Sequence, residues 1–219
     1  MTVRPKKPKA VAAAKRPPRA PAWRKFDPRL YDSPDGHMAD FGFGILKASS
    51  QGVSNSAFGY VRSKLRQEEG PLTAATFGRD VAANAFIVSP GCPDLLAKAE
   101  VFWPLVDSDV WKPDQHLAVA ITLWFPGVVF QHRAVRAASE FAQARLADAR
   151  GLCVQLVAHS PARISHGGDF HVHLVASARV AGADGVGVFA RDLLGHGGQT
   201  LLHSEWQNFL ADLPPSVRP

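Results

Sequence analysis

Two strand-like runs separated by a short polar loop constrain the fold of this chain more than any other feature. Residues 153–159 and 170–179 are rich in apolar and β-branched side chains, and residues 160–169 between them are rich in Ser, Pro and Gly. Two such runs joined by a short loop are typical of an antiparallel hairpin. Because side chains alternate across a strand, residues two apart in each run face the same side of the sheet. We therefore expect an antiparallel sheet that contains this hairpin.

Strand and helix patterns follow one another along the rest of the chain. Further strands are expected over residues 41–49 and 116–125, with a short one over 85–88. Helices are expected over 54–68, 94–106, 130–150 and 199–212, the third closed by Gly151. This order predicts an α+β domain of two layers, with helices packed on an antiparallel sheet.

Composition excludes several classes of protein. A chain of 219 residues that is 46% hydrophobic and 20% charged can bury the core of one domain. No run of 18 uncharged apolar residues suggests a membrane span, and the basic start lacks the apolar stretch of a secretory signal. Cys92 and Cys153 are not spaced as a zinc ribbon, and they indicate reduced thiols. We therefore expect a cytoplasmic protein.

The positive charge is concentrated at the N-terminus. Nine Lys and Arg and no acid stand in residues 1–25, against a net charge of +6 for the whole chain, so the remainder carries −3. We predict a disordered basic tail and linker over 1–36, a folded domain over 37–213 and a short C-terminal tail over 214–219. The basic tail is either a solvated leader or an arm attracted to nucleic-acid phosphates.

Three histidines are the strongest candidates for chemistry. His171 and His173 are two apart on a predicted strand, so they face the same side, and His159 ends the preceding strand. Three converging imidazoles form a metal site that leaves positions open for water and substrate. His166 and Asp169 in the loop are alternative ligands. The competing interpretation is that the histidine pair is structural and binds no metal.

The same residues carry a resemblance to a known family. Residues 152–179, LCVQLVAHSPARISHGGDFHVHLVASAR, are similar to the third motif of the MobA/MobL plasmid-mobilisation relaxases, which are HUH-type single-strand DNA endonucleases. The segment SNSAFGYVR over 54–62 resembles the family's tyrosine helix, and residues 101–103 and 140–143 resemble two further helices. The resemblance covers about residues 40–212 and implies a palm-like antiparallel sheet, in agreement with the fold predicted above.

The resemblance also implies a mechanism. It places His159, His171 and His173 on the family's metal triad, with manganese or magnesium as the divalent ion and zinc as the alternative, and Tyr60 as the nucleophile. Metal-dependent, strand-specific nicking of DNA at a transfer origin would then pass through a phosphotyrosine link. The partners it implies are single-stranded DNA and accessory mobilisation proteins. Side chains that we expect to contact DNA are Arg62, Lys64 and Arg66, with Phe58 or Trp103 stacking on bases.

Some positions depart from the family pattern. The acidic pair usual on the strand before the family's "ALP" segment is replaced by Ala120 and Thr122, and its Asn-Pro before the histidine pair by Asp169 and Phe170. Two alternatives to a relaxase therefore stay open. One is a catalytically degenerate homologue that binds single-stranded DNA without cutting it. The other is an unrelated metal hydrolase with three histidine ligands.

Overall fold

A single antiparallel sheet organises the part of the chain that the computed structural model describes, residues 29–30, 38, 40–67 and 70–219. Its six strands stand in the spatial order β1-β2-β6-β8-β7-β5, and every neighbouring pair is antiparallel. The strands are β1 (Arg29–Leu30), β2 (Phe41–Lys47), β5 (Val81–Ile87), β6 (His116–Phe125), β7 (Val154–His159) and β8 (Phe170–Ser177). Strands β7 and β8 form the hairpin expected from the sequence, and they stand between β6 and β5 in the sheet.

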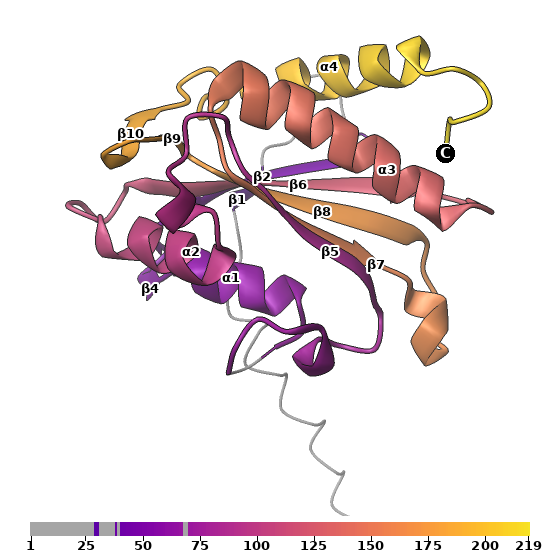
Figure 1. The fold of residues 1–219 in the computed structure, drawn as a ribbon, viewed down its shortest axis with the longest axis horizontal. Coiled ribbons are helices and arrows are strands. Elements are labelled where there is room, and N and C mark those ends of the chain that lie inside the picture. Colours follow the sequence, from indigo (N-terminus) through magenta and orange to yellow (C-terminus); the bar gives the residue numbers. More distant parts are fainter. Residues whose placement is uncertain (1–28, 31–37, 39, 68–69) are drawn as a thin grey trace, which may run out of the picture.

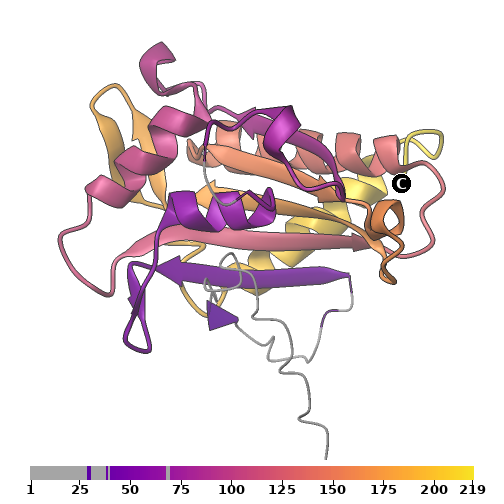
Figure 2. The same cartoon turned by 90° about the horizontal axis from the view of Figure 1, so that it is seen from below.

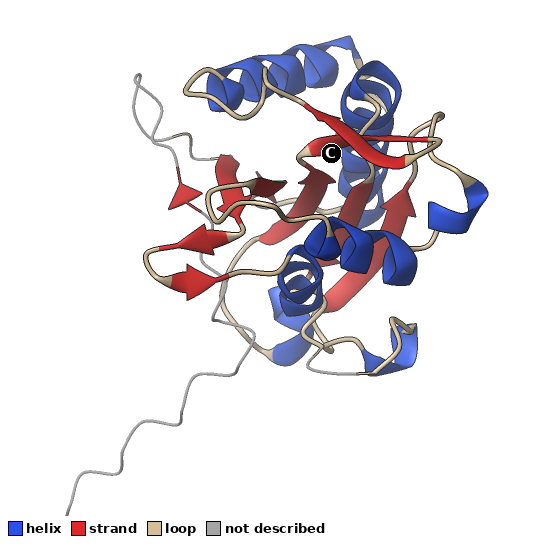
Figure 3. Cartoon of the chain, turned by 90° about the vertical axis from the view of Figure 1, so that its left-hand side faces the viewer, coloured by secondary structure: helices blue, strands red, loops and turns tan. Residues whose placement is uncertain are grey.

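Helices cover both faces of this sheet. On one face lie α1 (Ala57–Lys64) and α2 (Ala99–Ser108), and on the other lie α3 (Gln131–Phe141) and α4 (Gly198–Asp212) (Figure 1). Figure 2 shows α1 and α2 lying across the strands when the molecule is seen from below, and Figure 3 shows the strands between the two sets of helices. A π-helical segment, Ala142–Asp148, continues α3. None of the described helices has the length and apolar character needed to cross a membrane.

Short elements connect these layers. They are the hairpin of β3 (Ser49–Ser50) and β4 (Val53–Ser54), the hairpin of β9 (Arg179–Gly182) and β10 (Gly185–Phe189), and 3₁₀ turns at Ala74–Thr76, Asp94–Leu96 and Pro161–Ile164. The first hairpin leads directly into α1, so the start of that helix is fixed close to the end of β2.

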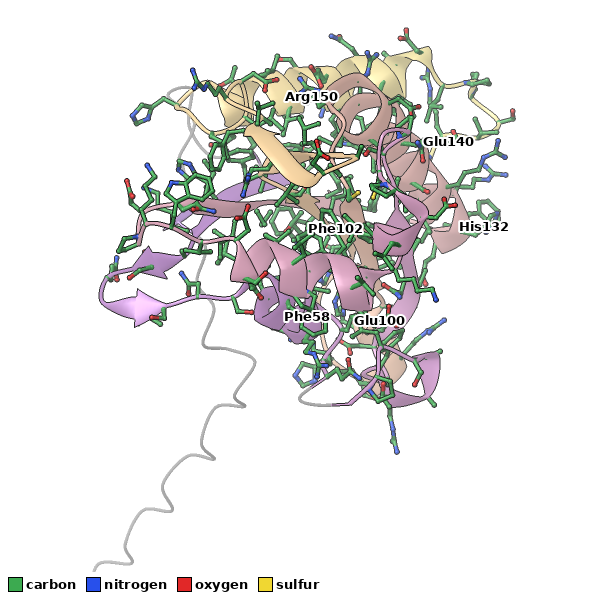
Figure 4. The ribbon with its side chains drawn as sticks, turned by 60° about the vertical axis from the view of Figure 1, so that its left-hand side comes forward. Phe58, Glu100, Phe102, His132, Glu140 and Arg150 are labelled. Carbon is green, nitrogen blue, oxygen red and sulfur yellow. The ribbon has the colours of Figure 1, made fainter. Side chains whose placement is uncertain are left out.

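Two hydrophobic clusters separate the faces, and the alternation of the strands builds both. In β8, Val172 and Leu174 belong to the cluster under α3 and α4, whereas Val175 belongs to the cluster under α1 and α2. Phe102 lies in the interior, while His132 and Glu140 lie on the outside of α3 (Figure 4). His171 and His173 share the side of Val175, so the sheet aims them toward α1 and α2.

Helix α1 is anchored at its N-terminus by a carboxylate from α2. The Ser56 hydroxyl accepts a hydrogen bond from the Gly59 N–H at 2.8 Å and donates one to Asp107 at 2.5 Å. Asp107 also accepts from the backbone N–H groups of Ala57 at 2.5 Å and Phe58 at 3.1 Å. An acid at the positive end of a helix satisfies amides that have no partner within the helix. This contact fixes where α1 crosses the sheet.

The structure confirms the predicted α+β class and the antiparallel sheet. Because helices pack on both faces, the domain has three layers where the sequence suggested two. The strand predicted over 85–88 begins earlier, at Val81, and the helix predicted over 94–106 divides into a 3₁₀ turn and α2. Arg29 and Leu30 pair with Ile45 and Gly44 of β2, so part of the predicted tail over 1–36 belongs to the sheet. The other residues of that predicted tail lie outside the described part of the chain.

Candidate active site

The hairpin brings the three predicted histidines together on one face of the sheet. In the β7–β8 register His159 stands directly opposite His171, and His173 is two residues further along β8. The ring centres are 5.2 Å apart for His159 and His171, 5.2 Å for His159 and His173, and 5.0 Å for His171 and His173. Three imidazoles thus form a compact triangle.

Each imidazole holds a hydrogen-bond partner at its Nδ1 atom. The partners are an Asp80 carboxylate oxygen for His159 at 3.1 Å, the Asp169 carbonyl for His171 at 2.9 Å and the Thr122 hydroxyl for His173 at 2.9 Å. The Nε2 atom of His159 is buried and has no hydrogen-bond partner. A buried nitrogen without a partner is costly unless a ligand occupies it. A contact at one ring nitrogen also orients the other toward a metal, as in known metal-bound histidines.

The surroundings of the three histidines lower the pKa of each imidazole and so favour its neutral form. Burial lowers the pKa of His159 to about 4, although the neighbouring Asp80 acts in the opposite direction. Burial also lowers the pKa of His171, and burial together with the Lys64 ammonium holds the pKa of His173 well below its usual value. A neutral imidazole has a lone pair free for a metal, so these pKa shifts suit a ligand role.

The spacing of the rings also fits a shared ion. Imidazoles bound to one ion through metal–nitrogen bonds of about 2.0–2.1 Å at tetrahedral angles have ring centres on the order of 5 Å apart. Within the described residues, no group of three or more His, Cys, Asp or Glu side chains already has the arrangement of a metal-ligand set. Binding of an ion therefore requires an adjustment of the three side chains from the positions described here.

Asp80 is a site residue that the sequence did not reveal. It precedes β5 at the edge of the sheet, its backbone carbonyl accepts from the Ser160 N–H at 2.8 Å, and its carboxylate contacts both His159 and Arg66, the latter at 3.4 Å. Burial raises the pKa of Asp80, but His159 and Arg66 outweigh it, so the pKa is lowered. Asp80 lies 79 positions before His159 in an irregular stretch, so no local pattern could have indicated the pair.

Thr122 and Ala120 stand at the two positions where the resembled family usually has its acidic pair. Thr122 pairs with His173 across β6 and β8, and its hydroxyl contacts that ring. Ala120, two residues earlier, is 9% exposed and belongs to the apolar cluster under α1 and α2. The side-chain partners of the histidines are therefore the Thr122 hydroxyl and the carboxylate of Asp80, which is distant only in the sequence.

Tyr60 and the triad lie on the same side of the sheet, with Lys64 beside both. Tyr60 is buried in α1 at 3% exposure, and the Lys64 ammonium lies 4.8 Å from the centre of its ring. The same ammonium lowers the pKa of His171 and His173 electrostatically. Burial and repulsion from Arg66 lower the pKa of Lys64 itself to about 8. A cation held beside neutral imidazoles is suited to an anionic ligand.

The other predicted DNA-contacting residues divide between the site and its surroundings. Arg66 is joined to the triad through Asp80, whereas the Arg62 guanidinium lies over the Phe58 ring at 4.5 Å and donates to the Gly70 carbonyl at 2.7 Å. Phe58, labelled in Figure 4, is partly exposed on α1. Trp103 is fully buried at 0% exposure, so the expectation that it stacks on bases is wrong. The alternative ligand His166 lies in an exposed loop, and the Asp169 carbonyl contacts His171.

Comparisons with known proteins show the family to which the chain belongs. The chain matches the MobA/MobL family over residues 53–209, which is more than half of its length and includes Tyr60, Asp80 and all three histidines. No curated protein matches the chain in sequence. It is also similar to a solved structure from a study titled "Molecular Basis of Vancomycin Resistance Transfer in Staphylococcus aureus". That similarity has a TM-score of 0.60 at 17% sequence identity and covers 78% of this chain and 90% of the other. The chain therefore belongs to the MobA/MobL family, the plasmid-mobilisation relaxases that its histidine and tyrosine segments resemble.

Proposed function

We propose that this protein is a metal-dependent relaxase that nicks one DNA strand at a transfer origin and keeps the cut strand bound through Tyr60. The observation that carries the proposal is the triangle of three imidazoles, one buried and two partly exposed, each with its Nδ1 atom already hydrogen-bonded. Such a triangle would suit a metal ion, and Tyr60 and Lys64 lie on the same side of the sheet. Family membership supports DNA mobilisation as the setting.

The metal would be held by His159, His171 and His173. A divalent ion, manganese or magnesium with zinc as the alternative, would polarise the non-bridging oxygens of the scissile phosphate and stabilise the charge that develops there. Asp80, Thr122 and the Asp169 carbonyl would keep the rings in orientation. Partners of this kind commonly contribute about 10–100-fold to metal affinity.

Tyr60 would carry out the covalent step. Its hydroxyl oxygen forms a bond to the scissile phosphorus, and the bond from that phosphorus to the 3′ oxygen breaks. The phenol loses its proton and the departing 3′ oxygen gains one, so the products are a 5′-phosphotyrosyl link and a free 3′-OH. The Tyr60 side chain is almost wholly buried, so only a small part of it is open to an incoming phosphate.

The cations of α1 would guide the strand. Lys64 lies beside the triad and Arg66 beside Asp80, so both would meet phosphates near the cut, whereas the Arg62 guanidinium lies over Phe58. Contacts to phosphates position a strand without reading its sequence. Recognition of the origin therefore needs other residues of the chain or accessory mobilisation proteins.

One other function is favoured by specific observations. A homologue that binds single-stranded DNA without cutting it is consistent with the buried Tyr60 and with Ala120 and Thr122 in place of the family's acidic pair. This alternative retains the DNA-binding surface and lacks the covalent step. The two functions therefore differ in one measurable product.

Covalent capture of DNA tests the proposal. The purified protein would be incubated with Mn²⁺ and labelled single strands from the intergenic DNA beside its own gene, and adducts would be resolved on denaturing gels. We expect wild-type protein to form an adduct and Tyr60→Phe to form none. Tyr31→Phe, which removes the other tyrosine of the chain, is the matched control and should form the wild-type amount. Undiminished adduct with Tyr60→Phe would refute Tyr60 as nucleophile, and wild-type binding without an adduct in any metal would favour the non-cutting homologue.

A further inference from the structure

Trp124 is an exposed aromatic residue next to the histidine triangle. It stands at the end of β6 directly opposite His171 of β8, two residues beyond Thr122. Directly paired residues of neighbouring strands project from the same face, so the indole lies on the face that carries the triad. Trp124 is 36% exposed, whereas Trp103 and Trp206 are almost completely buried. A large aromatic side chain is therefore partly open to solvent beside His171.

A glycine in the neighbouring strand leaves room for this indole. A Cβ atom built on Gly42 of β2 would lie 2.7 Å and 2.8 Å from two carbons of the Trp124 ring, and 3.4 Å from the Thr122 Cβ. The ring thus lies against the bare backbone of β2, where any larger residue would displace it. One side of the indole is supported by the sheet, which holds it in place as a rigid surface.

The surface continues from Trp124 into an apolar groove edged by cations. A cavity of about 520 Å³ is lined by Trp124, the loop that follows β6, and residues from the chain's C-terminal end. In that loop Val129 is 81% exposed and Phe130 49% exposed, and the Arg133 guanidinium lies 4.4 Å above the Phe130 ring. Arg218 also lines the cavity. The only acid among the lining residues, Asp40, accepts a hydrogen bond from Gln207 of α4 at 3.0 Å.

We propose that Trp124 is a stacking platform for a nucleobase of single-stranded DNA, one or two nucleotides from the phosphate that is cut. The inference rests on the proposed function and adds a base-binding position to it. Indole faces bind bases of any sequence by stacking, and neighbouring arginines attract the backbone. Phosphate at the triad and base at Trp124 are two parts of one ligand, because Trp124 is paired with His171. The groove along Phe130 and Arg133 would take the nucleotides that follow.

The contribution of stacking can be measured without any cleavage. Fluorescence anisotropy of a labelled oligothymidylate would be recorded with full-length protein in EDTA, for wild type and Trp124→Leu. Loss of one stacked base corresponds to a decrease in affinity of about 5- to 150-fold. Trp124→Phe retains an aromatic face and should retain most of the affinity. Trp111→Leu is the matched control. Trp111 is 59% exposed and precedes β6, so it lies away from the end of the strand that carries Trp124. The Arg179 guanidinium lies 4.9 Å from the centre of its ring.

Two further arms separate stacking from other causes. An oligomer of abasic deoxyribose phosphates should bind wild type and Trp124→Leu equally, since it has no base to stack. Gly42→Ala should weaken oligothymidylate binding because it displaces the indole without altering it, and thermal unfolding will show whether each variant is folded. Wild-type affinity in folded Trp124→Leu would overturn the inference and leave the proposed relaxase function intact.

Discussion

The two faces of the sheet are made by the same strands yet differ in character. Under α3 and α4 the inward residues are apolar, and the aromatic rings of Phe125, Phe141 and Phe209 surround Trp206 with ring centres 5.1–6.1 Å away. Under α1 and α2 an apolar cluster is interrupted by the three histidines and their partners. One face is a core, and the other is a core with a cluster of polar residues at one end.

The apolar face mainly stabilises the fold, whereas the polar residues of the other face lower its stability. Apolar side chains packed around Trp206 stabilise the fold by leaving water. The buried His159 loses hydration, as to a smaller extent do the partly exposed His171, His173 and Lys64. A fold that needed only stability would place apolar residues at His171 and His173, as it does at Val172 and Leu174 on the opposite side of the same strand. The polar residues of the α1 face therefore agree with the proposed binding of an ion and an anionic ligand.

The largest effect on stability is expected on the apolar face. Trp206 is 2% exposed, so Trp206→Ala leaves a large cavity and should lower the free energy of unfolding by about 3–5 kcal/mol. Chemical denaturation monitored by circular dichroism measures this change. The matched variant Trp111→Ala, at a site 59% exposed, should cost less than about 1 kcal/mol. Equal losses for the two tryptophans would contradict the assignment of the main core to the α3–α4 face.

A smaller effect of opposite sign is expected on the α1 face. The pKa of Lys64 falls from 10.5 to about 8 because the folded protein buries its ammonium and places it near Arg66. Lys64→Met removes that unfavourable charge, and since solvent screens the partly exposed side chain we expect a gain of about 1 kcal/mol at pH 7. The same variant should bind oligothymidylate more weakly, because a phosphate contact is lost. Stability gained at the expense of function is common at binding sites.

The pH dependence of this gain follows from the sign of the shift. Below about pH 8 Lys64 is charged in both the folded and the unfolded chain, so the full penalty is present and the methionine variant is favoured. Between about pH 8 and 10.5 the unfolded chain binds more protons than the folded one, so wild-type stability rises relative to the variant. Thermal unfolding of both proteins from pH 7 to 10.5 checks this. A gain that does not shrink with pH, or an equal gain from Lys98→Met on the exposed start of α2, would contradict the account.

Features that depend on local pattern were predictable, and features that depend on distant contacts were not. The ten residues of β6 match the strand expected from their β-branched run, and the β7–β8 hairpin follows from two such runs and a polar loop. Period-two alternation alone was enough to place His171 and His173 on one face. These features need only the residues of one segment.

Asp80, Asp107 and Trp124 required the folded structure. Asp80 reaches His159 across the β5–β7 edge, and Asp107 caps α1 from the end of α2, 51 positions from Ser56. The sequence indicates only that Trp124 belongs to a buried strand. The structure shows that its ring lies over Gly42, that it pairs with His171 and that it is partly exposed. The β9–β10 hairpin was likewise missed, because residues 182–187 indicate a turn without showing that strands flank it.

Metal binding by the histidine triangle tests the central claim most directly. Isothermal titration of the metal-free protein with Mn²⁺ would compare wild type with the double variant His171→Ala/His173→Ala and with the control His132→Ala, whose imidazole is exposed on α3. We predict binding of one ion by wild type and by the control, and loss of that binding in the double variant, with circular dichroism showing that the sheet remains folded. Unchanged Mn²⁺ affinity in the folded double variant would show that the triangle is not a metal site.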